Sequence, residues 1–129
     1  MPAARDHMSR DLLTVDSAMP LAEVASQMVE RSVGAVLVLE GERLSGILTE
    51  RDVLRAVARG IREDAIVRDW MTSGPDTIGP DETTEHAATL MMHGGFRHLP
   101  VTEGETVIGI LSIRDLMAIA LADSAPRGV

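Results

Sequence analysis

The chain has 129 residues, 45% of them hydrophobic and 25% charged, a composition typical of a compact folded domain rather than of a disordered chain. The formal net charge is −8 and every basic residue is an arginine, which argues against a broad basic surface for nucleic acid or an anionic membrane. Without cysteine, the chain has no disulfides, thiolate metal sites or cysteine nucleophile. It also lacks a signal peptide and any apolar run near the roughly 18 residues that cross a bilayer, so we expect a cytoplasmic protein.

The first half predicts a short extended segment, a helix, two strands and a second helix. The extended segment is Leu13–Val15, and Pro20–Arg31 has apolar residues at the i, i+3, i+4 and i+7 spacing of a helix with one buried face. The β-branched run Ala35–Leu39 and the returning run Leu44–Leu48 predict a hairpin. A second helix is expected from Thr49 to near Gly60, where the glycine suits its end.

The second half predicts the same elements in the same order. They are a strand at Ile78, a helix over Thr83–His93, strands over Leu99–Thr102 and Val107–Leu111, and a helix over Ser112–Ala122.

The two halves are related by a sequence duplication. The segment Gly46–Asp52 recurs as Gly109–Asp115, and the same offset aligns Met8-Ser9 with Met71-Thr72 without a gap. We therefore expect an α+β fold of two β-α-β-β-α repeats. A half of this size with a three-stranded sheet cannot cover both faces of that sheet, so the repeats are expected to pack about a pseudo-twofold axis. Within the single module 1–129, the predicted parts are repeat 1 (4–60), a linker (61–66), repeat 2 (67–122) and a flexible tail (123–129).

Several motifs in this pattern resemble one known family. They are the two Gly-x-x-[Ser/Thr]-x-x-Asp segments at the strand-to-helix junctions, the Arg97–Val101 segment and the paired Met-[Ser/Thr] segments. Together they resemble the tandem cystathionine-β-synthase-type (CBS) domain pair, or Bateman module, over all but the last residues. The resemblance implies a cleft between the repeats for AMP, ADP, ATP or another adenosyl compound. It also implies assembly into flat dimers and regulation of a partner; with no effector domain in the sequence, we expect a stand-alone module.

The duplicated motif predicts two ligand sites: site 1 at Thr49 and Asp52, and site 2 at Ser112 and Asp115. A carboxylate accepts hydrogen bonds and suits the paired hydroxyls of a ribose, while the hydroxyl residue can contact the sugar or the α-phosphate. The helix N-terminus favours an anion, and Gly46 is expected to let the backbone come close. The same spacing also describes a capping box, in which the two side chains satisfy only their own backbone. Both interpretations remain open.

Basic residues distinguish the two sites. Arg97 and His98 align with Gly34 and Ala35 of the first repeat. In the family, basic residues at this strand start serve the aspartate of the other repeat, so the resemblance implies that Arg97 and His98 face the phosphates at Asp52. Site 1 is then the competent nucleotide site, and site 2 is weaker or empty. The alternatives are a solvated arginine and a histidine that only packs at a strand edge.

Adenine requires an apolar slot, although a role in the core explains each candidate equally well. The candidates for this slot are Val15, Val36, Ile78, Leu99 and Pro100. Arg51 and Arg114 precede the two aspartates directly, and either reach the phosphates or remain solvated.

Nothing in the sequence indicates catalysis or a metal site. His86 and His93 are seven residues apart on one predicted helix, about 10.5 Å along its axis, too far to share an ion. The sequence contains no nucleophile elbow, P-loop or dinucleotide fingerprint. We therefore expect a non-catalytic regulatory module that requires no cofactor and binds an adenosyl ligand. The alternative is a structural or interaction module with vestigial clefts.

The last predicted helix points to a protein partner. Its segment Leu116–Ala122 is apolar nearly all round, so the helix is expected to be buried on two sides. One side would face the core of the repeat and the other a second copy of the chain, in a homodimer. A separate regulated protein, which the sequence does not name, is the further expected partner.

Overall fold

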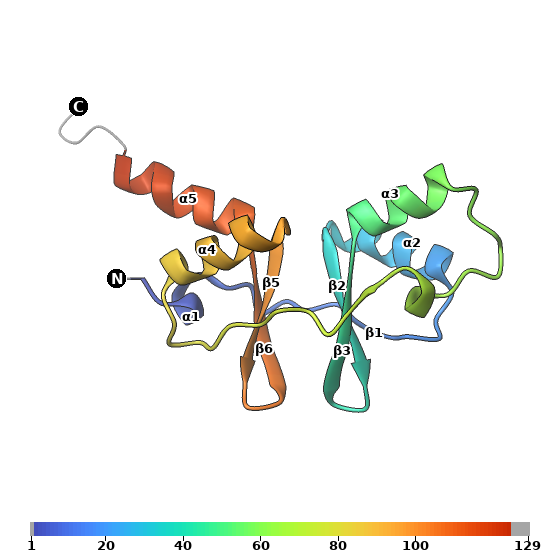
Figure 1. Cartoon of the computed structure of the whole chain (residues 1–129), viewed down its shortest axis with the longest axis horizontal. Coiled ribbons are helices and arrows are strands. Elements are labelled where there is room, and N and C mark those ends of the chain that lie inside the picture. Colours follow the sequence, from blue (N-terminus) through green and yellow to red (C-terminus); the bar gives the residue numbers. More distant parts are fainter. Residues whose placement is uncertain (1, 125–129) are drawn as a thin grey trace. The chain divides into compact units, whose positions relative to one another are not determined.

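Each repeat begins with a lead-in segment, residues 2–10 in the first repeat and 67–75 in the second. Each lead-in segment belongs to the compact unit that contains the other repeat (Figure 1). The computed structural model describes residues 2–124, and these divide into two compact units. The first unit comprises residues 11–75, and the second combines the residues up to 10 with those from 76 onward. Each unit thus contains the hairpin and helices of one repeat together with the lead-in segment of the other.

The first unit is built on a four-stranded sheet in the order β1-β2-β3-β4. Strand β1 pairs with β2 in parallel, and the remaining neighbours are antiparallel. The elements of this unit are β1 (Thr14–Asp16), α2 (Leu21–Arg31), β2 (Ala35–Glu40), β3 (Arg43–Thr49), α3 (Glu50–Ala58), the 3-10 turn η1 (Val67–Asp69) and β4 (Thr72–Ser73). The sheet therefore has one strand more than the three expected, and this fourth strand comes from the lead-in segment of the second repeat.

The second unit is built on the hairpin β5–β6. Its elements are α1 (Ala4–His7), α4 (Thr84–Gly94), β5 (His98–Glu103), β6 (Thr106–Ser112) and α5 (Ile113–Ser124). Ile78 joins Val101 through a single parallel bridge, and Ser9 joins Ile110 through an antiparallel one. The strand expected at Ile78 is thus a single bridge rather than a full strand.

The predicted order of β-α-β-β-α elements is confirmed in both repeats. Three short elements that the sequence did not predict, α1, η1 and β4, all lie in the lead-in segments. Helix α5 extends to Ser124, two residues into the tail expected at 123–129, and the rest of that tail lies outside the described residues. No helix within residues 2–124 is long and apolar enough to cross a membrane.

Each unit has its own hydrophobic core. In the first unit, Leu21, Val24 and Met28 point from α2 into the core, as the helical spacing predicted. In the second unit, Met91 of α4 and Leu111 of β6 are among the buried residues. Burial of a side chain of this size contributes about 1.5–3 kcal/mol, so these clusters dominate the stability of each unit.

An ion pair holds α1 in the second unit. The Arg5 guanidinium donates to Asp81 Oδ1 from Nε at 3.1 Å and from Nη2 at 2.6 Å. The hydrogen bond and the negative charge of Asp81 raise the pKa of Arg5 above its ordinary value. Since both side chains are largely solvated, the pair positions the helix more than it stabilises the fold.

Two glycines accept the methionines of the lead-in segments. A Cβ on Gly46 would lie 2.5 Å from Met71 Sδ and 2.9 Å from the carbonyl oxygen of Thr72. A Cβ on Gly109 would lie 2.3 Å from Met8 Sδ. Gly46 thus lets the backbone of β4 and the Met71 side chain come close to β3.

Candidate functional site

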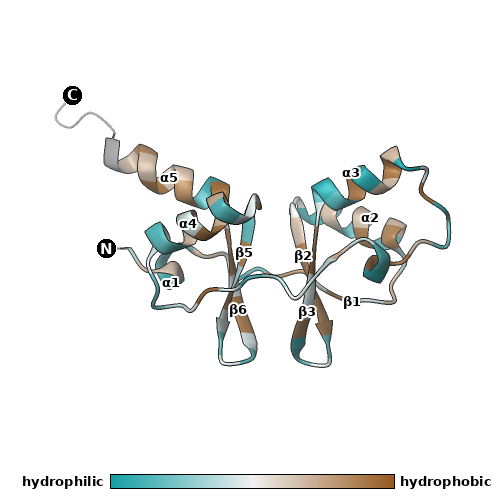
Figure 2. Cartoon of the chain, in the orientation of Figure 1, coloured by the Kyte–Doolittle hydropathy of each residue, from teal (hydrophilic) through white to brown (hydrophobic). Residues whose placement is uncertain are grey.

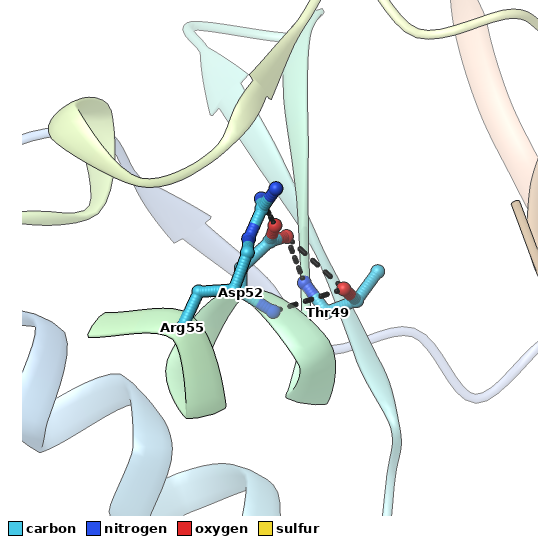
Figure 3. A network of polar contacts seen from close by, with 3 residues as sticks. All are labelled: Thr49, Asp52 and Arg55. Atoms are coloured by element: carbon cyan, nitrogen blue, oxygen red, sulfur yellow. Dashed lines mark hydrogen bonds and ion pairs between the residues drawn. The ribbon is translucent and has the colours of Figure 1, made fainter. Parts of the chain in front are cut away.

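The N-terminus of α3 carries site 1 and forms a closed capping box (Figure 3). Asp52 Oδ2 accepts hydrogen bonds from the Thr49 backbone N–H at 2.8 Å and from the Thr49 hydroxyl at 3.1 Å. The Asp52 N–H donates in turn to Thr49 Oγ1 at 3.4 Å. The two residues therefore satisfy backbone donors at the start of their own helix, as the capping interpretation of the sequence expected.

A third residue, Arg55, completes this network. Its guanidinium Nη2 donates to Asp52 Oδ1, the carboxylate oxygen that faces away from Thr49 (Figure 3). The Asp52 side chain is only 6% exposed, whereas that of Arg55 is 54% exposed. Each oxygen of this nearly buried carboxylate thus has a donor from the start of α3, two on Oδ2 and one, from Arg55, on Oδ1.

Site 2, at the start of α5, has the same box without the arginine. Asp115 Oδ2 accepts from the Ser112 N–H at 2.8 Å, and the Asp115 N–H donates to Ser112 Oγ at 3.1 Å. The position that matches Arg55 is Ala118. Asp115 is half-buried and forms no ion pair with any residue in the described range 2–124. The two aspartates therefore differ in both burial and charge pairing.

Arg97 and His98 lie in the second unit, beside the start of α5. The Arg97 carbonyl accepts a hydrogen bond from the Ile113 N–H at 2.8 Å, and His98 is opposite Ser112 in the β5–β6 register. Arg97 is exposed and His98 is partly buried. The structure thus brings these two residues to site 2 of their own repeat, while Asp52 belongs to the other unit. The combination of Arg97 with Asp52 stays a prediction.

The candidate adenine contacts are all core residues. Val15 and Val36 belong to the core of the first unit, Ile78 and Leu99 to that of the second, and Pro100 is buried in β5. Packing alone accounts for these five side chains.

Sequence reasoning missed Arg55. The signal was present in the duplication, because matching positions of the two repeats hold an arginine and an alanine three residues after the aspartate. Residues three apart are neighbours on a helix surface, so this difference predicts an ion pair in one repeat only. Arg51 and Arg114, by contrast, are both exposed and make no ion pair within the part of the chain that the structure describes.

The histidines of α4 do not build a metal centre. His86 Nε2 lies 3.2 Å from Glu82 Oε1 at the surface of the second unit. Among the described residues, no group of three or more His, Cys, Asp or Glu side chains is arranged to hold a metal ion.

Comparison with known proteins places this geometry in context. The model of the family described as "CBS domain" matches residues 4–59 and 67–122. The uncharacterized 17.7 kDa protein in the bps2 3′ region of Acidianus ambivalens is 39% identical over 106 residues, which are 80% of this chain and 63% of that protein. The chain thus spans less than two thirds of the length of this relative.

Two solved structures share the fold at a sequence identity of 25% and 31%. The CBS-domain containing protein of Agrobacterium tumefaciens has a TM-score of 0.85 and 31% identity, covering 92% of this chain and 98% of its own. A CBS domain protein of Pyrobaculum aerophilum, solved as a complex with AMP, has a TM-score of 0.83 and 25% identity, covering 95% of this chain and 99% of its own.

Proposed function

Because the chain belongs to the CBS domain family and carries two such domains in tandem, we propose that it is a regulatory module that binds an adenine nucleotide. The observation that carries this proposal is the duplicated hydroxyl-x-x-aspartate motif at the starts of α3 and α5. The similar Pyrobaculum aerophilum protein was solved with AMP, which favours a ligand of this class.

Site 1 is the main nucleotide site in this proposal. Asp52 accepts hydrogen bonds from the ribose hydroxyls, and Thr49 contacts the sugar or the α-phosphate. Arg97 and His98 supply positive charge to the phosphates. Site 2 binds more weakly.

The module acts without catalysis and requires no cofactor. It passes the ligand signal to a separate protein in the cytoplasm. The sequence contains no catalytic motif, and its resemblance to the CBS domain pair implies regulation of a partner; these two points support this part of the proposal.

A second copy of the chain docks on α5. This helix is apolar over most of its length, whereas α3 alternates hydrophilic and hydrophobic residues (Figure 2). Met117 on α5 is 57% exposed, and its counterpart on α3, Leu54, is 68% exposed. In sedimentation at tens of micromolar, Met117→Glu should yield monomer and Leu54→Glu should leave the dimer intact. A wild-type monomer would contradict the dimer.

One observation favours a second function, that of an interaction module with vestigial clefts. Both oxygens of Asp52 are already satisfied within α3. If they never exchange partners, the motif serves only the fold.

Thermal shift against AMP, ADP, ATP, S-adenosylmethionine, NAD and GTP separates these two functions. A ligand at one hundred times its Kd stabilises the fold by about 2.7 kcal/mol, which is readily measured in a small domain. In calorimetry, Asp52→Ala should abolish nucleotide binding and Asp115→Ala should leave most of it. The reverse result would exchange the roles of the two sites, and no shift with any ligand would favour the interaction module.

A further inference from the structure

Asp52 needs a donor at each oxygen whether or not a ligand is bound. A nearly buried carboxylate loses much of its hydration, and hydrogen-bond donors of the protein replace that water. Thr49 satisfies Oδ2 with two donors of its own, and Arg55 satisfies Oδ1.

The contact to Oδ1 can be exchanged more readily than those to Oδ2. The Thr49 donors include a backbone N–H that is fixed by the start of α3. The Arg55 guanidinium is on a long side chain that is 54% exposed, so it can leave Asp52 and be hydrated at once. Oδ1 is therefore the oxygen at which an incoming hydroxyl can replace a donor.

From this difference we infer that Arg55 is a built-in competitor for the ligand at Asp52, because its guanidinium occupies the contact to Oδ1 that a ribose hydroxyl would use. The inference rests on the proposed function and adds to it a residue that sets the affinity of site 1. Ala118 occupies the matching position, so site 2 has no such competitor.

Competition lowers the affinity of site 1 by the free energy of the contact that is broken. An ion pair with one solvated partner is worth up to about 1 kcal/mol, which corresponds to about a fivefold change in Kd. The effect is specific to the pair, because Arg59, the C-cap residue of the same helix, is exposed and makes no ion pair within residues 2–124.

The test is calorimetric titration with adenosine and with AMP in an Asp115→Asn background, in which binding reports on Asp52 alone. Arg55→Met keeps the length of the side chain and removes the donor, so adenosine should bind about fivefold more tightly. Arg59→Met removes the same charge from the same helix and should leave the adenosine Kd unchanged. Arg55→Lys keeps the charge and should fall between wild type and Arg55→Met. Circular dichroism confirms that each variant is folded.

The outcomes separate this inference from the proposed function. Unchanged or weaker adenosine binding in Arg55→Met, with the Asp115→Asn parent still binding, would overturn the competitor role alone. Tighter adenosine binding with weaker AMP binding would support it and would add a contact from the displaced arginine to the phosphate. If no variant and no wild-type protein bound either compound, the proposed function would fail and this inference with it.

Discussion

The starts of α3 and α5 share one motif but differ in how their aspartates are held. Asp52 is nearly buried and is paired with Arg55, whereas Asp115 is half-buried and is followed one turn later by Ala118. Both aspartates close a capping box with the preceding hydroxyl residue. The two repeats therefore share the local geometry of the helix start, but only the first has an arginine that is paired with the carboxylate.

This difference shows that the capping role occupies only one oxygen of each carboxylate. The cap uses Oδ2 in both repeats, which leaves Oδ1 for a second partner. In the first repeat that partner is Arg55. Whether a ribose can take its place is a matter of relative affinity, and variants of both repeats can measure it.

The largest effect on the free energy of unfolding is expected at the two glycines that contact Met8 and Met71. Gly46→Ala should cost about 3 kcal/mol, because the new methyl group meets a backbone oxygen of β4 as well as Met71. Gly109→Ala should cost about 1 kcal/mol, because only the flexible Met8 side chain has to move. Urea unfolding of the two variants checks this order, and equal losses would show that the Thr72 contact relaxes.

The next largest effect on the free energy of unfolding is expected from replacing the two aspartates. Asp52→Ala removes the acceptor of three hydrogen bonds and should cost about 2 kcal/mol. Asp115→Ala removes a simple cap and should cost about 1 kcal/mol. Thermal unfolding without ligand measures both. A larger loss for Asp115→Ala would contradict the burial difference between the two sites.

The smallest effects concern the arginine itself. Arg55→Met should destabilise the fold by about 0.5 kcal/mol, because the pair has one solvated partner. Ala118→Arg should stabilise it by about 0.3 kcal/mol by creating the matching pair with Asp115. Both changes should shrink when salt is raised, and salt-independent values would show that packing, not charge, is responsible.

The sequence predicted those parts of the fold that repeat along the chain. Hydrophobic spacing located α2, and the offset between Gly46 and Gly109 revealed the two repeats. The sequence did not reveal that each lead-in segment packs in the unit of the other repeat. The alignment of Met8 with Met71 is the same whichever unit each of them packs in. The contact between Gly46 and Met71 was not predicted for the same reason, because the two residues are distant in sequence.

The candidate site was predictable in its residues but not in their contacts. The spacing of Thr49 and Asp52 predicted a cap or a ligand site, and the structure shows the cap. The pairing of Arg55 was missed because most arginines in the first turns of a helix are solvated. The packing of Val36 and Leu99 was anticipated, since core residues and an adenine slot use the same side chains.

The most direct test of the account compares AMP with 2′,3′-dideoxyadenosine monophosphate in calorimetry. If Asp52 accepts the ribose hydroxyls, the dideoxy compound should bind at least about tenfold more weakly, since each hydrogen bond to a charged group contributes roughly 1.5–3 kcal/mol. Asp52→Ala should bind neither compound measurably. Equal affinity of the wild-type protein for the two compounds would contradict the account, because the carboxylate would then have no part in holding the sugar.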